Sequence, residues 1–464
     1  MKKRIACIAA AAISATALFS GCFVTQGADG RDGKDGQNAS VYDYYEMAKS
    51  VHGEDYSIEE FLHDYLNYTS EEVENAINYQ ASINRSLMSA VSIAASFNIR
   101  GSYGQAGTTT ALGSGVIVDL DKEAGDAYIL TNAHVVYNDS SSELYSQNVY
   151  CYLYGQDGDF YDEDSRFSAS VIGASITYDV ALLKVTGSDL IKNSSAIAAQ
   201  FSAEDDIYLG EKVYTVGNAE GCGLSATSGI ITKDREVIAL NLSDRYANSE
   251  SYYRCYTVLR TDAAVNEGNS GGALFNGRGE IVALINSKSG DEEDEYGFII
   301  DDIDAMNNAI PVSIVRRLYL LMRDGYEKNG FDSHNAKLDR AHFVVMEDFT
   351  YLEQTSPATS AKIEVKAVSC ATSWDNENLR AVINEKVVMQ QDANGLKQGD
   401  VIKHVKITDN GGNVIENRPV SRLYHLQDAL LSAREGYGIV ITVSRGGNST
   451  DVDVTSQMNF YEFD

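Results

Sequence analysis

Positively charged residues are scarce in this sequence. Its 464 residues include 37 Lys and Arg against 67 Asp and Glu, which gives a formal net charge of −30 at pH 7. Proteins bind the phosphate backbone of nucleic acids through clustered Lys and Arg, and no basic stripe interrupts the acidic sequence. The composition therefore argues against a nucleic-acid partner.

Proline is also rare, with three residues at 311, 357 and 419. Because the usual level is about 5%, Pro-rich stalks and collagen-like triple helix are excluded as major elements. Beyond the N-terminal segment, no stretch reaches the roughly 18 uninterrupted apolar residues of a membrane-spanning helix. Hydrophobic residues nevertheless make up 44% of the chain, which is typical of a globular protein.

Cysteines are few and widely spaced. Apart from Cys7 and Cys22, the sequence has Cys151, Cys222, Cys255 and Cys370. They form no Cys-x-x-Cys pair and have no local His partners, so the sequence predicts no metal site, and no cofactor is expected. Of the pairings within a single predicted domain, a disulfide between Cys222 and Cys255 is the one worth testing, and it stays open.

The N-terminus has the pattern of an export signal. Lys2, Lys3 and Arg4 precede an apolar stretch at 5–19, which ends in Ser20-Gly21-Cys22. This order is typical of a secretory signal peptide. The Cys after Ser-Gly resembles the lipobox of bacterial lipoproteins, which implies a signal peptide at 1–21 and a lipid on Cys22. We therefore expect an exported protein, lipid-anchored at the extracytoplasmic face of the cell membrane. Ordinary cleavage with an incidental Cys22 is the alternative.

Two short segments follow the signal. Residues 22–40 contain four Gly-X-Y triplets without proline, too few for a triple helix alone, and are predicted to form a flexible linker. Residues 41–91 show helical periodicity, with capping-box patterns at Ser57-x-x-Glu60 and Thr69-x-x-Glu72. We expect two or three short helices there.

From residue 92 the pattern changes to short β-strands separated by Gly, Asn and Asp. The predicted strands lie at 115–120, 128–131, 149–154, 180–185, 212–216, 228–232, 256–260 and 280–286. Such a series indicates an all-β barrel or sandwich. A helix at 312–322, directly after Pro311, is expected near the end of this domain, which we place at 92–325.

The strongest chemical signal is the run Asn266-Glu267-Gly268-Asn269-Ser270-Gly271-Gly272. Glycines beside a serine allow a tight turn in which backbone N–H groups point at one spot, as an oxyanion hole next to a nucleophile requires. A serine hydroxyl needs a base to take its proton. His134, after the apolar strand 128–131, is the one histidine between residues 92 and 330.

An imidazole that acts as a base needs an acceptor at its other nitrogen. Asp179 opens the apolar strand 180–185 and is the candidate for this acceptor. His134, Asp179 and Ser270 therefore match the roles of a Ser-His-Asp triad.

Five motifs together resemble the HtrA (Deg) family of trypsin-like serine proteases. They are Gly113-Ser-Gly-Val-Ile-Val, Leu130-Thr-Asn-Ala-His-Val-Val, Tyr178-Asp-Val-Ala-Leu-Leu-Lys, Thr261-Asp-Ala-Ala-Val-Asn-Glu-Gly-Asn-Ser-Gly-Gly and Ala309-Ile-Pro-Val. The resemblance implies a mainly β fold, a chymotrypsin-type double β-barrel with the triad between the barrels. It also implies oxyanion donors in the backbone N–H groups of Gly268 and Ser270.

The resemblance also indicates where substrate binds. The oxyanion turn spans Gly268, Asn269 and Ser270, and the floor of the substrate pocket is expected near Ala264 and Val265. Substrate backbone is expected to pair along Ile285, Asn286 and Ser287, with a small or aliphatic side chain preceding the cleaved bond. The sequence departs from the family at Glu267, where proline is usual, and at 301–308, which interrupt the step before Ala309.

The C-terminal part, 335–464, resembles the PDZ domain that commonly follows the protease in this family. It contains Gly395-Leu-Lys-Gln-Gly-Asp-Val-Ile402, a helical pattern at 426–433 and a strand pattern at 438–445. We expect an α+β PDZ-like domain that captures C-terminal peptides by strand addition, with an insertion between residues 346 and 384.

The sequence therefore predicts a membrane-anchored serine endopeptidase that hydrolyses unfolded or damaged proteins. The alternative is a catalytically idle or gated scaffold or chaperone that binds polypeptides through the same modules. The family resemblance implies a homo-oligomer, often a trimer, with either function. Residues 41–93 show no sustained heptad repeat, so the sequence itself does not predict a coiled-coil oligomer.

Overall fold

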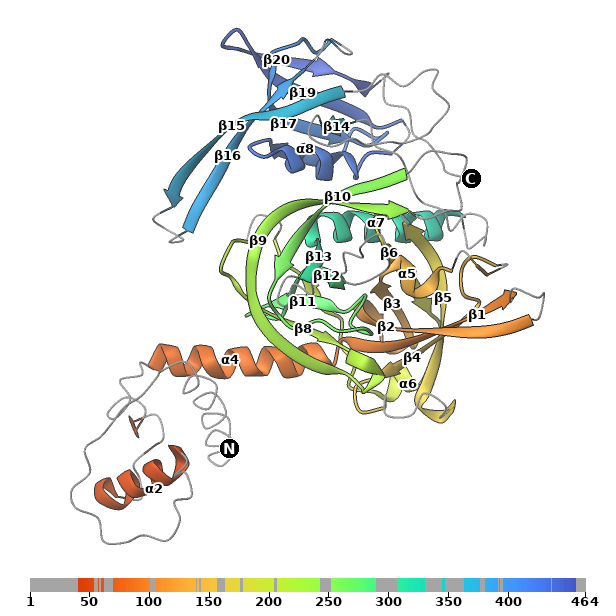
Figure 1. The fold of residues 1–464 in the computed structure, drawn as a ribbon, viewed down its shortest axis with the longest axis vertical. Helices are drawn as coiled ribbons and strands as arrows, with labels where there is room; N and C mark the ends of the chain where they lie inside the picture. The colour runs from red at the N-terminus through yellow and green to blue at the C-terminus, as the bar shows by residue number, and fades with distance from the viewer. Residues whose placement is uncertain are drawn as a thin grey trace, which may run out of the picture. The chain divides into compact units, whose positions relative to one another are not determined.

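The computed structural model describes residues 41–455 except for several stretches. These are 54–56, 58–59, 62–69, 101–105, 139, 142, 157–162, 176–177, 204–206, 243–251, 289–306, 330–343, 347–362, 376–379, 391, 393–394 and 435. The chain divides into two compact units (Figure 1): Met1–Arg85 with Gly277–Gly279, and Ser86–Asn276 with Glu280–Asp464. The predicted signal peptide, the linker and Cys22 lie outside the described residues.

The first unit is helical where it is described, as the sequence predicts. Helix α2 spans Val41–His52 and α4 spans Ser70–Leu87. The capping box at Ser57 is confirmed: Ser57 N donates to Glu60 Oε2 over 2.7 Å, and Glu60 N donates to Ser57 Oγ over 3.1 Å. Thr69 of the second capping box is outside the described part. None of the described helices is long and apolar enough to cross a membrane.

The second unit begins with a closed six-stranded barrel. Its strands are β1 Ala90–Arg100, β2 Ala106–Asp121, β3 Asp126–Thr131, β4 Asn148–Leu153, β5 Arg166–Ser175 and β6 Val180–Val185. They follow the order β1-β2-β3-β6-β5-β4 around the barrel. β1 starts inside the segment predicted to be helical, so that prediction is wrong from Ala90 onward. Its Ala and Ser residues have no strong strand preference, and pairing with β2 and β4 decides their conformation.

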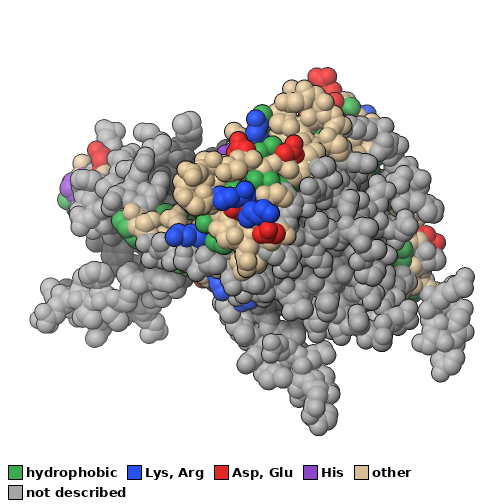
Figure 2. Space-filling view, turned by 90° about the horizontal axis from the view of Figure 1, so that it is seen from above, with side chains coloured by type: hydrophobic (Ala, Val, Ile, Leu, Met, Phe, Trp, Pro, Cys, Tyr) green, Lys and Arg blue, Asp and Glu red, His purple; other side chains and the backbone are tan. Residues whose placement is uncertain are grey.

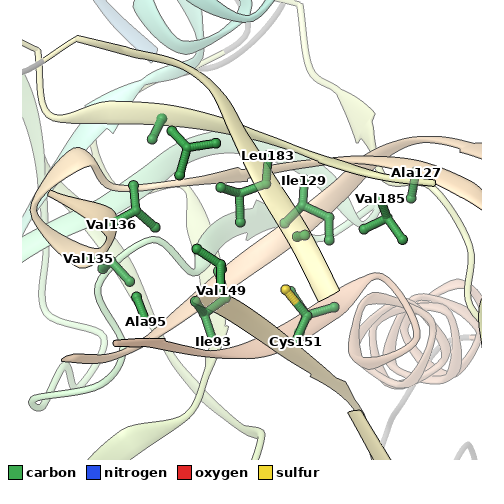
Figure 3. Packing of buried hydrophobic residues seen from close by; sticks show 14 of the residues in the cluster. Ile93, Ala95, Ala127, Ile129, Val135, Val136, Val149, Cys151, Leu183 and Val185 are labelled. Atoms are coloured by element: carbon green, nitrogen blue, oxygen red, sulfur yellow. The ribbon is translucent and has the colours of Figure 1, made fainter. Parts of the chain in front are cut away.

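Alternate residues of these strands fill the barrel interior (Figure 3). Ile93, Ile129 and Leu183, from three different strands, are fully buried there. Val135 and Val136 of the short helix α5, Ala133–Val136, point into the same core. Their burial fixes the helix that carries His134 at the end of the barrel.

A second set of strands forms the other half of the predicted protease domain. It contains β7 Gln200–Phe201, β8 Lys212–Gly217, β9 Ser225–Leu242, β10 Tyr252–Thr261, β11 Ala273–Asn276, β12 Glu280–Lys288 and β13 Asn307–Pro311. The order is β11-β8-β9-β10-β13-β12-β7, and a further β11–β12 pairing closes six of the strands into a ring. The mainly β, double-barrel fold class is thereby confirmed.

Two helices complete this region. α6 spans Asp189–Asn193, and α7 spans Val312–Asn329, which confirms the helix expected after Pro311. Met322 of α7 is fully buried, and a Cβ on Gly173 of β5 would meet its side chain. Asn307 and Asn308, which the sequence analysis assigns to an interruption before Ala309, belong to β13.

The C-terminal part has a third sheet and one helix. The strands are β14 Val344–Met346, β15 Ile363–Asp375, β16 Arg380–Met389, β17 Val401–Thr408, β18 Val414–Pro419, β19 Gly438–Arg445 and β20 Asn448–Asp453. The path is β14-β15-β16-β17-β19-β20, with β18 beside β17. Helix α8 is Leu423–Leu430, three residues earlier than expected, because the apolar positions at its N-terminal end include Leu423.

The strand at 438–445 is confirmed as β19. The insertion predicted between residues 346 and 384 includes β15 and the start of β16, which pair antiparallel. Acidic and basic side chains lie next to one another on the face seen in Figure 2. In the turn before β17, the buried carboxylate of Asp400 accepts hydrogen bonds from Arg445 Nε over 2.8 Å and Nη2 over 2.6 Å.

His425 in α8 makes the stability of the protein depend on pH. Its side chain is buried, and burial, together with nearby positive charges such as Arg418, lowers its pKa to about 3. An unfolded histidine has a pKa near 6.5, so between pH 6.5 and 3 the unfolded state binds the additional proton. The stabilising contribution of neutral His425 is therefore complete above pH 6.5 and is lost as the pH falls.

We expect this residue alone to reduce the free energy of unfolding by on the order of 3 kcal/mol between pH 7 and pH 4. Urea unfolding followed by circular dichroism should show a steeper loss of stability in the wild type than in His425→Gln. The comparison removes the contribution of carboxylates, which both proteins share. Equal pH slopes in the two proteins would contradict the prediction.

Candidate active site

His134 and Asp179 are brought together by two neighbouring strands of the first barrel. His134 follows β3 and Asp179 precedes β6, and these strands pair with Thr131 opposite Ala181. His134 Nδ1 lies 2.7 Å from Asp179 Oδ2, and the His134 backbone N–H donates to Asp179 Oδ1 over 2.8 Å. The Asp179 side chain is 8% exposed, whereas that of His134 is 51% exposed. The imidazole is therefore oriented by a buried carboxylate and is about half exposed.

Further hydrogen bonds hold Asp179 in place. Its φ of 54° is unusual for a residue with a side chain and costs about 1 kcal/mol or more. Asn132 Nδ2 donates to the Asp179 carbonyl over 2.8 Å, and Asn286 Nδ2 donates to Asp179 Oδ2. These contacts fix both the backbone and the carboxylate of Asp179.

Ser270 lies in the glycine-rich turn before β11. Gly268 and Gly271 have φ values of 91° and 83°. A Cβ on Gly268 would collide with the Asn218 carbonyl, and one on Gly271 with the Ser114 carbonyl. Both positions therefore require glycine, because the backbone has a positive φ there and because other backbone segments pass too close for a side chain.

The hydroxyl of Ser270 donates to the Asn286 carbonyl over 3.3 Å. In the described part of the chain it makes no hydrogen bond to His134. Asn286 thus contacts Ser270 through its carbonyl and Asp179 through its side chain. Hydrogen bonds between catalytic groups are often absent or long before substrate binds and tighten only in the complex.

The predicted oxyanion turn leaves two amides free. Among the described residues, the N–H groups of Gly268 and Ser270 donate to no protein acceptor. The Asn269 N–H donates to Asn266 O over 3.0 Å. Asn269, the middle residue of the predicted oxyanion turn, therefore uses its N–H to hold the turn together.

Ser114 anchors this turn to the first barrel. Its hydroxyl donates to Gly268 O over 2.6 Å and accepts from Asn218 N over 2.8 Å, and its backbone N–H donates to Ser270 O over 2.8 Å. This role of Ser114 was not predicted from the sequence, although the Gly113-Ser-Gly motif contains the residue. The role of Asn132 was not predicted either, and its position two residues before His134 was the available signal.

The predicted substrate-binding residues lie in two adjacent segments. Val265 and Ile285 are buried and pack in one hydrophobic cluster, whereas Ala264 is exposed and its carbonyl accepts from Thr227 Oγ1 over 2.7 Å. Ile285 pairs with the turn after Ser270, through Gly271 N to Ile285 O at 3.0 Å and Ile285 N to Gly272 O at 2.8 Å. Ser287 belongs to β12, but its side chain is outside the described set.

Cys222 follows Asn218 in the loop beside the Gly268 turn. Its thiol is free and exposed. The disulfide with Cys255 that the sequence left open is therefore absent from the described structure.

Comparisons with known proteins match the part of the chain that contains these residues. Residues 113–284 match the trypsin-like peptidase domain family. Periplasmic serine endoprotease DegP of Escherichia coli is 30% identical over 281 residues, which cover 59% of this chain and 50% of DegP. Serine protease Do-like HtrA of Lactococcus lactis is 28% identical over 363 residues, 76% of this chain and 74% of that protein.

Among solved structures, an HtrA-type protease, AlgW, with a decapeptide covers 81% of this chain and 96% of its own, at 18% identity and a TM-score of 0.42. This chain spans about half the length of the first DegP relatives that it matches. Across the matched residues, which include His134, Asp179 and Ser270, the chain is similar to HtrA-type serine proteases with a trypsin-like peptidase domain.

Proposed function

We propose that this protein is an exported serine endopeptidase that hydrolyses peptide bonds of unfolded or damaged proteins. The observation that carries the proposal is the 2.7 Å contact between His134 Nδ1 and Asp179 Oδ2, in the same domain as a glycine-flanked Ser270. The free amides of Gly268 and Ser270 support it further, because they provide donors for a developing oxyanion.

In the proposed mechanism, substrate first engages the Asn286 carbonyl. A substrate N–H that donates to this carbonyl replaces the Ser270 hydroxyl, which then turns to His134 Nε2. His134 takes the proton as Ser270 Oγ attacks the peptide carbonyl, and Asp179 stabilises the imidazolium that forms. The Gly268 and Ser270 amides bind the oxyanion.

Collapse of the tetrahedral intermediate breaks the peptide bond. His134 returns the proton to the leaving amine, and water, activated by the same histidine, then hydrolyses the acyl-serine. Asp179 remains ionised throughout and holds the imidazole in the orientation that its hydrogen bonds define.

The remaining parts have proposed roles in location and substrate capture. Export fits the N-terminal signal pattern, and three of the relatives are named periplasmic serine endoproteases. Lipid attachment at Cys22 would hold the enzyme at the membrane. The C-terminal sheet with α8 is proposed as a PDZ-like domain at 335–464 that adds a peptide C-terminus as an extra strand.

A fluorophosphonate probe tests the function directly, because it reacts only with an activated serine. Labelling of the purified protein, followed by peptide mapping, is expected to place the probe on Ser270, and the same protein is expected to cleave casein. Protein unfolded in urea is the control and should not react. Labelling at another serine, or none in the folded protein, would contradict the proposal.

A further inference from the structure

Asn307, the first residue of β13, carries a buried polar atom that its surroundings do not satisfy. The residue is 3% exposed, and its Nδ2 donates to the Ala263 carbonyl over 2.8 Å. Its Oδ1 is buried and accepts no hydrogen bond from the part of the chain that the structure describes. Buried polar atoms are nearly always paired, so this acceptor is available to a hydrogen-bond donor that arrives from outside.

The strand register places Asn307 beside the predicted substrate pocket. It lies opposite Lys288 of β12, and Ala309 lies opposite Ile285. Residues two apart in a strand share a face, so Asn307 and Ala309 point the same way. Ala309 packs against Val265 and Ile285.

The hydrogen bond to Ala263 fixes where the amide sits. Ala263 immediately precedes Ala264 and Val265, the predicted pocket floor, and β12, which pairs with β13, would form the neighbouring wall. Ser270 contacts Asn286 of that same wall. A substrate side chain that enters between the wall and the floor, next to Ser270, therefore approaches Asn307.

We propose that Asn307 Oδ1 determines specificity by accepting a hydrogen bond from the substrate side chain that precedes the cleaved bond. The preferred residues are uncharged donors, namely Ser, Thr, Asn and Gln. This inference rests on the proposed peptidase function and specifies its substrate class. It replaces the expectation from the sequence that a small or aliphatic side chain precedes the cleaved bond. That expectation rested on Ala264 and Val265 and did not include Asn307.

Other classes of substrate side chain are disfavoured beside Asn307 Oδ1, each for a different reason. An aliphatic side chain excludes water from Oδ1 and supplies no donor, which leaves a desolvated polar atom. A carboxylate brings a second acceptor to the same place. Lys and Arg bring a charge that the apolar side chains of Val265, Ile285 and Ala309 cannot pair.

Isosteric peptides provide the test. Two pairs of otherwise identical peptides carry Thr or Val, and Asn or Leu, before the cleaved bond. In the wild type we expect kcat/KM to be about tenfold or more higher for Thr than for Val and for Asn than for Leu. Asn307→Leu keeps the side-chain shape without the amide, and the preference should disappear or reverse.

A matched variant and a label separate the outcomes. Asn276→Leu replaces an equally buried asparagine that bonds to Glu280 in β12, and it should retain the wild-type preference. The wild type could be labelled on Ser270 and yet cleave the Val and Leu peptides as efficiently as the Thr and Asn peptides. That result would overturn this inference and leave the proposed function intact. A wild type that neither reacts with the probe nor cleaves any peptide would overturn both.

Discussion

Replacement of Ser270 by alanine is expected to lower kcat/KM for peptide hydrolysis by about 10⁶-fold. The hydroxyl is the nucleophile of the proposed reaction, and no other group at the turn can form the acyl intermediate. The loss should be confined to activity, because the hydroxyl makes one hydrogen bond, to Asn286 O at 3.3 Å, among the described residues. Such a bond contributes about 1 kcal/mol to stability.

Casein cleavage and unfolding midpoints, measured on the same preparations, check this prediction. Ser202→Ala is a suitable control, since Ser202 is 2% exposed and its hydroxyl has no hydrogen-bond partner in the described structure. This variant should match the wild type in both measurements. More than a few per cent of wild-type activity in Ser270→Ala would mean that another residue is the nucleophile.

The local chemistry around Ser270 is predictable from sequence because it depends on adjacent residues. Gly268 and Gly271 are required by the turn itself, and their positive φ values agree with that reading. His134 is likewise predictable, because it follows an apolar strand and is the one histidine available in the region. The spacing of His134 and Ser270 along the chain still says nothing about the distance between them in the fold.

The contacts that organise the site are long-range, and the sequence does not encode them locally. Asn286 binds the carboxylate of Asp179 across 107 positions, and Ser114 reaches Gly268 across 154. The family resemblance assigns Asn286 to substrate binding, whereas its bond to Asp179 depends on how the two barrels meet. Asn307 is a similar case, since only the pairing of β13 with β12 brings it near the proposed substrate pocket.

The fold was predictable where strands are apolar and bounded by turn residues, as in β6 and β8. It was not predictable for β1, whose Ala and Ser residues also suit a helix, or for the β15–β16 pair. In these segments hydrogen bonds to neighbouring strands, and not the preferences of the residues, decide the conformation. The elements that carry His134, Asp179 and Ser270 belong to the predictable class.

Asp179→Asn is expected to reduce kcat/KM by about 10⁴-fold while the fold is retained. Asp179 Oδ1 accepts the His134 backbone N–H, and Oδ2 faces His134 Nδ1. An asparagine whose oxygen keeps the first bond must present its NH₂ group to Nδ1. That group donates, so the ring is forced to carry its proton on Nε2.

A histidine with its proton on Nε2 cannot accept one from Ser270, which is why so conservative a change has so large an effect. The NH₂ group would also face the donating Nδ2 of Asn286, which removes a second bond that orients the site.

Nitrogen-15 NMR of the His134 ring should show the altered tautomer beside the kinetic loss. Asp189→Asn, on an exposed aspartate that pairs with Lys192, should change neither measurement. A fully active Asp179→Asn enzyme would show that this carboxylate does not orient the base, and the assignment of the triad would then be wrong.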